Sequence, residues 1–149
     1  MSGFNRSRLP RRKRCKGGSA LEMALLLPWY AFLFVGVFDW GFYSHALIST
    51  QAAARSAALY TSTSSTTAAD QATACIYARN ELKVSNNVSA TTACTSTPLI
   101  VTASAVTGAD GQPASQVTVT YQTLSLIPIP GLLEKQFWIS YTAQFRLRS

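Results

Sequence analysis

The apolar stretch from Gly17 to Trp40 constrains the fold of this chain more than any other part. No charged side chain occurs between Met23 and Phe38. With its flanks the apolar run reaches roughly twenty residues, which in a helix rising about 1.5 Å per residue crosses a bilayer core about 30 Å thick. The sequence therefore predicts a membrane-spanning helix, followed by roughly a hundred residues for one small domain.

The positive charge of the chain lies ahead of that stretch. The formal net charge is +7, and seven of the thirteen Lys and Arg residues precede Gly17, while the other six balance the six acids. A basic segment beside an apolar helix is typical of the cytoplasmic flank of a membrane span. A nucleic-acid-binding arm is less consistent with the sequence, because the rest of the chain has no basic patch.

A secretory signal peptide is the third interpretation of this region, but the apolar run is longer than the usual core of such a peptide. No A-x-A cleavage site followed by a polar mature start is evident either. We therefore expect a retained anchor, with 1–17 as a basic cytoplasmic leader, 18–43 as the transmembrane segment and 44–149 as a domain outside the cytoplasm.

Cysteine usage agrees with that topology. Cys75 and Cys94 lie in the expected exported domain, and Cys15 lies in the leader. An even pair in an exported domain predicts one disulfide, which would contribute about 3 kcal/mol by closing its loop. Two free buried thiols are the alternative.

Two helices are expected. The first continues past the membrane to about Tyr60, and its later part carries a stripe of small side chains, Ala46, Ser49, Ala53 and Ala57. Such a stripe permits close approach to a sheet or to another helix, although a solvated helix would show it too. The second helix is expected over about 68–84.

Three strands follow, at 99–106, 116–122 and 137–147, where apolar and polar residues alternate or β-branched residues gather. The last strand has an apolar face made of Phe137, Ile139, Tyr141, Ala143, Phe145 and Leu147. An apolar, Pro-containing loop at 124–135 precedes it. The expected fold class is α+β, with two helices and a small three-stranded antiparallel sheet.

The sequence offers little for catalysis. His45 is the one histidine, the acids are scattered, and no nucleophile elbow, phosphate-binding loop or zinc-ligand motif occurs. We therefore predict a protein that is not an enzyme, with no catalytic residue, no metal site and no cofactor.

The residues around Gly17 and Glu22 carry a resemblance. If the bond after Gly17 is cut, Gly18 becomes position one and Glu22 position five. This spacing resembles the processing site of type IV prepilins, and particularly that of Flp pilins and TadE-like pseudopilins. Cleavage after Gly18 would instead place Glu22 at position four.

The resemblance continues along the chain. The order SALEMALLLP, FDWG and QAAARSAA, in 19–28, 38–41 and 51–58, is similar to the amino-terminal signature of the TadE-like family. The closing WISYTAQFR, in 138–146, resembles the last strand of that family.

The resemblance implies a pilin-like fold and a minor pilin or pseudopilin that assists assembly of an Flp-type, tight-adherence pilus and its secretion machine. It implies a single-pass protein of the bacterial inner membrane with its carboxyl-terminal domain in the periplasm. The partners implied are the membrane, other pilins or pseudopilins, pilus assembly proteins and a prepilin peptidase, with no nucleic acid and no small-molecule substrate. The alternative is an uncleaved single-pass adaptor or envelope scaffold of a secretion complex.

Glu22 has a physical role in this interpretation. A carboxylate in an apolar segment is costly unless it is paired or lies at an interface. The freed amino terminus of a neighbouring subunit could pair with it and set the register of assembly. The alternative is that Glu22 lies near the cytoplasmic headgroups and pairs with arginines of the leader.

Overall fold

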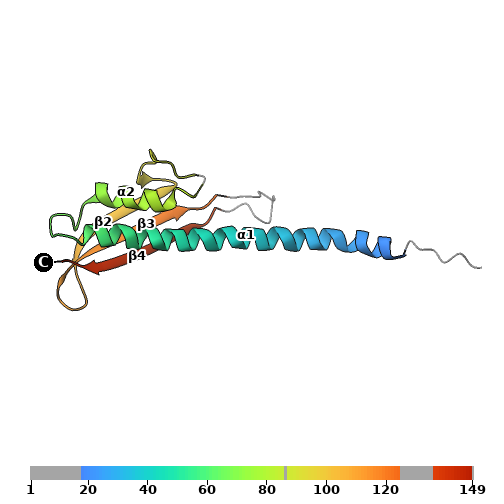
Figure 1. Ribbon diagram of the computed structural model, residues 1–149, viewed down its shortest axis with the longest axis horizontal. Coiled ribbons are helices and arrows are strands. Elements are labelled where there is room, and N and C mark those ends of the chain that lie inside the picture. The colour runs from blue at the N-terminus through green and yellow to red at the C-terminus, as the bar shows by residue number, and fades with distance from the viewer. Residues whose placement is uncertain (1–17, 86, 125–135, 149) are drawn as a thin grey trace, which may run out of the picture. The chain divides into compact units, whose positions relative to one another are not determined.

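The computed structural model describes residues 18–85, 87–124 and 136–148. Two helices and four strands occur in the order α1 (Gly18–Thr61), α2 (Gln71–Leu82), β1 (Thr95–Ser96), β2 (Leu99–Thr107), β3 (Pro113–Gln122) and β4 (Trp138–Arg146) (Figure 1). The chain divides into two compact units, one ending at Val37 and one beginning at Phe38, and each is described by itself. The predicted leader, Cys15, Gly17 and most of the predicted apolar loop lie outside the described residues.

The first unit contains the amino-terminal part of α1. Within the described residues, α1 is the single helix long and apolar enough to cross a membrane, and none of its 18 most apolar consecutive residues is buried inside the protein. Pro28 lies inside the helix without ending it. The predicted apolar helix is therefore confirmed from Gly18, the first described residue, onward.

The second unit contains an antiparallel sheet in the order β1-β2-β3-β4. The prediction of three strands is wrong, because the structure adds β1, whose residues Thr95 and Ser96 pair with Ile100 and Leu99. A strand of two residues has no alternation that a sequence could display. It forms because a tight connection folds it back onto β2.

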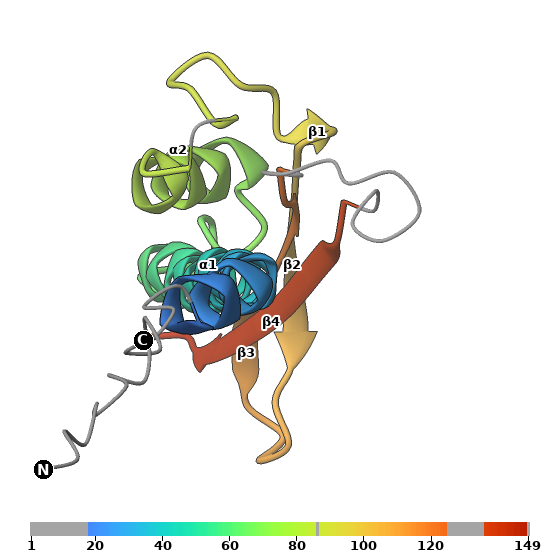
Figure 2. The same cartoon turned by 90° about the vertical axis from the view of Figure 1, so that its right-hand side faces the viewer.

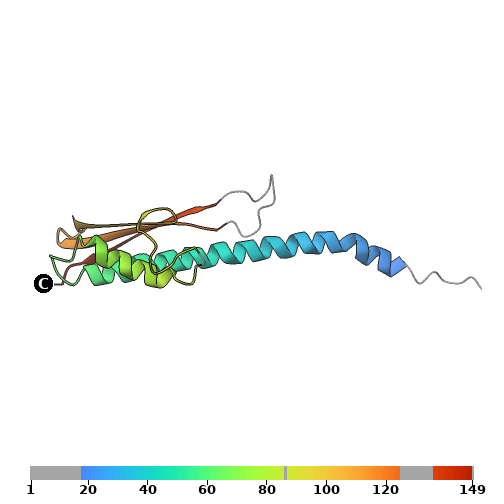
Figure 3. The same ribbon diagram turned by 90° about the horizontal axis from the view of Figure 1, so that it is seen from above.

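Both helices of the second unit pack on the same face of this sheet, as Figure 2 and Figure 3 show from two directions. Ala53 and Ala57 of α1 are fully buried and Ala46 nearly so, while Ser49 is half-buried. The predicted small-residue stripe is thus a packing face, and the alternative of a solvated helix is wrong. Opposite these alanines the sheet presents Leu99, Val101, Val117, Val119, Tyr121, Ile139 and Ala143.

Element boundaries differ slightly from the expected ones. The second helix covers Gln71–Leu82 and not 68–84, because Asp70 is its N-cap and accepts hydrogen bonds from the N–H groups of Ala72 and Thr73. β3 begins at Pro113, earlier than expected. The β2–β3 turn contains Gly111, whose φ of +74° favours glycine.

Candidate assembly surface and membrane segment

Gly18 and Glu22 lie at the start of α1. Gly18, the first described residue, is helical, and Glu22 follows four residues later, on the same side of the helix and about 6 Å further along its axis. Both residues are exposed. The structure thus places the first residue after the predicted cut one helical turn from the carboxylate. The bond itself involves Gly17 and lies outside the described residues.

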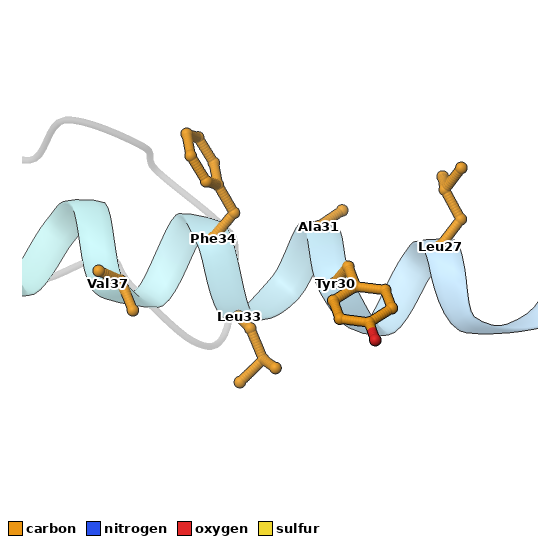
Figure 4. Close-up of a pocket in the computed structure, with 6 residues that line it drawn as sticks. All are labelled: Leu27, Tyr30, Ala31, Leu33, Phe34 and Val37. Atoms are coloured by element: carbon orange, nitrogen blue, oxygen red, sulfur yellow. The ribbon is translucent and has the colours of Figure 1, made fainter. Parts of the chain in front are cut away.

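Beyond Glu22 the surface of the first unit is apolar. A shallow hollow is lined by Leu27, Tyr30, Ala31, Leu33, Phe34 and Val37. Figure 4 shows that the small side chain of Ala31 lies between the larger ones of Leu27 and Phe34. A hollow of this kind offers van der Waals contact to a lipid chain or to an apolar side chain of another helix.

In the second unit, polar contacts fix α1 against the sheet. The side-chain amide of Gln51 donates a hydrogen bond to the hydroxyl of Tyr141 on β4, over 3.2 Å. A hydrogen bond from Arg55, together with that from Gln51, lowers the pKa of Tyr141. Gln51 and Arg55 are four residues apart and therefore reach the same tyrosine from one side of the helix.

A buried hydroxyl pair fixes the far end of α1. The Oγ1 of Thr61 lies 2.7 Å from the Oγ of Ser115 on β3, and that serine donates to the carbonyl oxygen of Ala68 over 2.9 Å. All three residues are buried. Because buried polar groups are costly when they are unpaired, this arrangement favours a single register of helix on sheet.

Gln71, the first residue of α2, holds this helix against β2. The side-chain amide of Gln71 donates to the carbonyl oxygen of Val101 and accepts from the N–H of Ala103 over 3.1 Å. β1 pairs with β2 only at Leu99 and Ile100, so the glutamine takes the place of a strand along the next part of that edge. This covers backbone groups that would otherwise remain open to pairing.

Two further contacts join α2 to its surroundings. Cys75 of α2 and Cys94 form a disulfide, as the sequence predicts. The rings of Tyr60 and Tyr77 stack with centroids 3.6 Å apart. Burial of its hydroxyl, helped by the hydrogen bond with Tyr60, raises the pKa of Tyr77.

No group of three or more His, Cys, Asp or Glu residues that could hold a metal occurs in the part of the chain that the structure describes. His45 is exposed, and its Nδ1 lies 3.5 Å from the Oγ of Ser49 on the same helix. The absence of catalytic, metal and cofactor sites stays a prediction.

Gly18, Glu22, the apolar hollow, Gln51 and Arg55 all belong to one continuous stretch. Residues 17–59 match the family model described as TadE-like protein. The resemblance predicted from the sequence is confirmed over this TadE-like segment. No curated protein and no solved structure matches the chain.

Side chains of the TadE-like segment have a hydrogen-bond partner that lies outside the segment. Tyr141, which binds Gln51 and Arg55, lies outside the segment. Sequence reasoning placed Tyr141 on the inner face of β4 but missed its role. The available signal was a tyrosine at an inward position, since a partly buried tyrosine hydroxyl usually needs a partner.

Proposed function

We propose that this protein is a non-enzymatic minor pilin or pseudopilin that takes part in assembly of an Flp-type, tight-adherence pilus. The observation that carries this proposal is the TadE-like match over 17–59, in a helix that begins at Gly18 and bears Glu22 ahead of an apolar surface. The TadE-like family is associated with this pilus machine, and an assembly role needs contact surfaces and no catalytic centre.

In the proposed topology, 1–17 is a basic cytoplasmic leader, 18–43 lies in the bacterial inner membrane, and 44–149 is a periplasmic domain. The excess of Arg and Lys before Gly17 supports this orientation. The Cys75–Cys94 disulfide supports it independently, because disulfides persist in the periplasm and are rare in the cytoplasm.

The proposed cycle begins when a prepilin peptidase cuts between Gly17 and Gly18. The new amino group of Gly18 then lies at the start of α1 and is available to a neighbouring subunit. The Glu22 carboxylate of that neighbour pairs with it inside the membrane, where an unpaired charge is costly. The apolar hollow around Ala31 packs against the helices of other pilins or pseudopilins.

The test is complementation of a deletion strain with the wild-type protein, with Glu22→Ala and with a matched control, Glu81→Ala, which removes an exposed carboxylate from α2. Membrane fractionation reports insertion, and recovery of sheared pili reports assembly. We expect all three proteins in the membrane fraction and a loss of pili with Glu22→Ala alone. Normal piliation with Glu22→Ala would contradict the proposed role of Glu22.

A further inference from the structure

Aromatic side chains gather where β4 begins. The rings of Tyr43 on α1 and Phe137 meet edge to face with centroids 5.5 Å apart, and Trp40 lies 6.2 Å from Tyr43 by the same measure. Trp138 follows Phe137 in the chain, and we call these four residues the aromatic cluster. Three of its members are well exposed, at 71% for Trp40, 50% for Phe137 and 51% for Trp138, and Tyr43 is half-buried. Rings of this size are seldom left in water without a partner.

Two hydrogen bonds hold the backbone of Phe137 in place. The carbonyl oxygen of Phe137 accepts a hydrogen bond from the N–H of Thr123 over 2.9 Å, and the N–H of Phe137 donates to the Oγ1 of Thr123 over 3.0 Å. Trp138 follows as the first residue of β4, so its side chain lies on the opposite face of the strand. The start of β4 thus presents an aromatic ring on each face, on a fixed backbone.

The position of Tyr43 along the chain indicates that the aromatic cluster lies near the expected membrane surface. Trp40 and Tyr43 lie at the end of the expected transmembrane segment, 18–43, where a span of about twenty residues leaves the hydrocarbon core. Trp and Tyr prefer this interface, because their rings are apolar and their N–H and O–H groups are polar. Since Phe137 packs on Tyr43, the start of β4 lies next to the last residue of the expected transmembrane segment.

The described charges of β3, β4 and the β2–β3 turn lie at the end of the sheet opposite to the aromatic cluster. No residue from Pro113 to Leu124 or from Gln136 to Phe145 is charged. Charges occur at the other end of the two strands, where Arg146 lies 3.9 Å from Asp110. Among the described residues, a bilayer surface would therefore meet aromatic and uncharged side chains at the start of β4, and the charged end would stay in water. Glu134 and Lys135, the charges nearest to this start in the sequence, precede Gln136 and lie outside the described residues.

We propose that Phe137 and Trp138 insert into the headgroup region of the leaflet from which α1 emerges, as a second lipid contact of the domain. The inference goes beyond the proposed function and rests on one part of it, that α1 spans the membrane. The occupant is lipid and not protein because the cluster is continuous with the interfacial residues of the span itself.

The experiment uses the full chain with single tryptophans, reconstituted in phosphatidylcholine vesicles. Trp29→Phe with Trp40→Phe leaves Trp138 as the single fluorophore, since the chain has three tryptophans. Vesicles contain plain lipid, lipid brominated near the glycerol end of its acyl chains, or lipid brominated near the chain ends. We expect the fluorescence of Trp138 to be lost in the first brominated lipid and largely kept in the second.

Two matched variants make the outcomes distinct. In a Trp138→Phe background, Thr142→Trp puts the fluorophore on the same face of β4, about 13 Å further along the strand, and bromine should leave it bright. A variant that keeps Trp29 alone reports on the transmembrane segment, and lipid brominated near the chain ends should quench its fluorescence.

If Trp29 is quenched and Trp138 is not, the result would overturn the lipid contact while the transmembrane segment stands. If Trp29 is not quenched, the result would overturn both. If the emission of Trp138 changes with the protein-to-lipid ratio but not with bromine, the aromatic cluster contacts a second copy of the chain and not lipid. This result would overturn the proposal.

Discussion

The amide of Gln51 binds the hydroxyl of Tyr141 at the middle of three contacts that align α1 with β3 and β4. Tyr43 meets Phe137 eight helical residues and four strand residues earlier. Eight residues of helix rise about 12 Å and four residues of strand about 13 Å, so the two elements stay in step. The third contact joins Thr61 to Ser115, which pairs with Phe145 of β4. Helix and strand therefore have one shared register.

Removing the hydroxyl of Tyr141 should weaken this alignment. Tyr141→Phe should lower the unfolding midpoint of the full chain in detergent, because Gln51 and Arg55 lose their common partner. Adding Gln51→Ala to Tyr141→Phe should cost less than the sum of the two single changes. The unfolding midpoints of the four proteins in urea give this comparison. Additive losses would show that the two side chains do not interact.

The effect of Tyr141→Phe should also depend on pH. Hydrogen bonds from Arg55 and Gln51 lower the pKa of Tyr141 in the folded protein below the ordinary value of 10.0. The folded state then binds fewer protons than the unfolded state in that range, so this contribution to stability is present above pH 10.0 and is lost as pH falls through the lowered pKa. The difference between wild type and Tyr141→Phe should therefore widen from neutral to alkaline pH.

Asp70 should act as a pH-dependent cap of α2. Hydrogen bonds from the hydroxyl and N–H of Thr73 lower its pKa below 3.8, so its contribution is present above pH 3.8 and is lost as pH falls through the lowered pKa. Asp70→Ala should lower the melting temperature at neutral pH and have little effect in strong acid. Asp70→Asn is the control, since asparagine also caps helices and does not titrate. Thermal melts followed by circular dichroism measure both, and an equal loss for the two variants at neutral pH would contradict the capping role.

The disulfide should stabilise the domain measurably. Its cysteines are 19 residues apart in sequence, and closing a loop of that size contributes about 3 kcal/mol. Cys75→Ala with Cys94→Ala, in a Cys15→Ser background, should lower the free energy of unfolding by about that amount. A reductant should destabilise the parent protein and leave the double variant unchanged. An equal response of both proteins to reductant would mean that the bond does not form.

The small residues of α2 should tolerate substitution only on the exposed side. Ala74 is fully buried against the sheet, so Ala74→Leu should cost about 1–3 kcal/mol through overpacking. Ala72 lies on the exposed side of the same helix, and Ala72→Leu should change stability by less than about 0.5 kcal/mol. Equal effects of the two substitutions on the urea midpoint would contradict the packing described.

Long regular patterns made most of the fold predictable. The apolar run, the stripe of small residues in α1 and the alternation in β3 and β4 each repeat over several turns or pairs, so the sequence displays them. The Cys75–Cys94 pairing was predictable because the domain holds just these two cysteines.

Other contacts left no such pattern. Gln71 replaces a strand partner of β2 through two hydrogen bonds over about thirty residues of sequence, and β1 forms only because β2 folds back beside it. Both depend on where the backbone meets itself in space. For the candidate site, the sequence indicated Glu22 and its spacing from Gly18, whereas the polar contacts of Gln51 and Arg55 became visible only in the folded structure.

The central claim is that this chain is processed and assembled as a pilin-like subunit, and an intact mass measurement tests it most directly. The protein should be purified from the membrane and pilus fractions of its native host, as wild type and as Gly17→Ala. We predict a mass that begins at Gly18 for wild type and a full-length mass for Gly17→Ala. A full-length mass in both samples would contradict the claim and indicate a permanently anchored adaptor, in which Glu22 has no amino terminus to pair with.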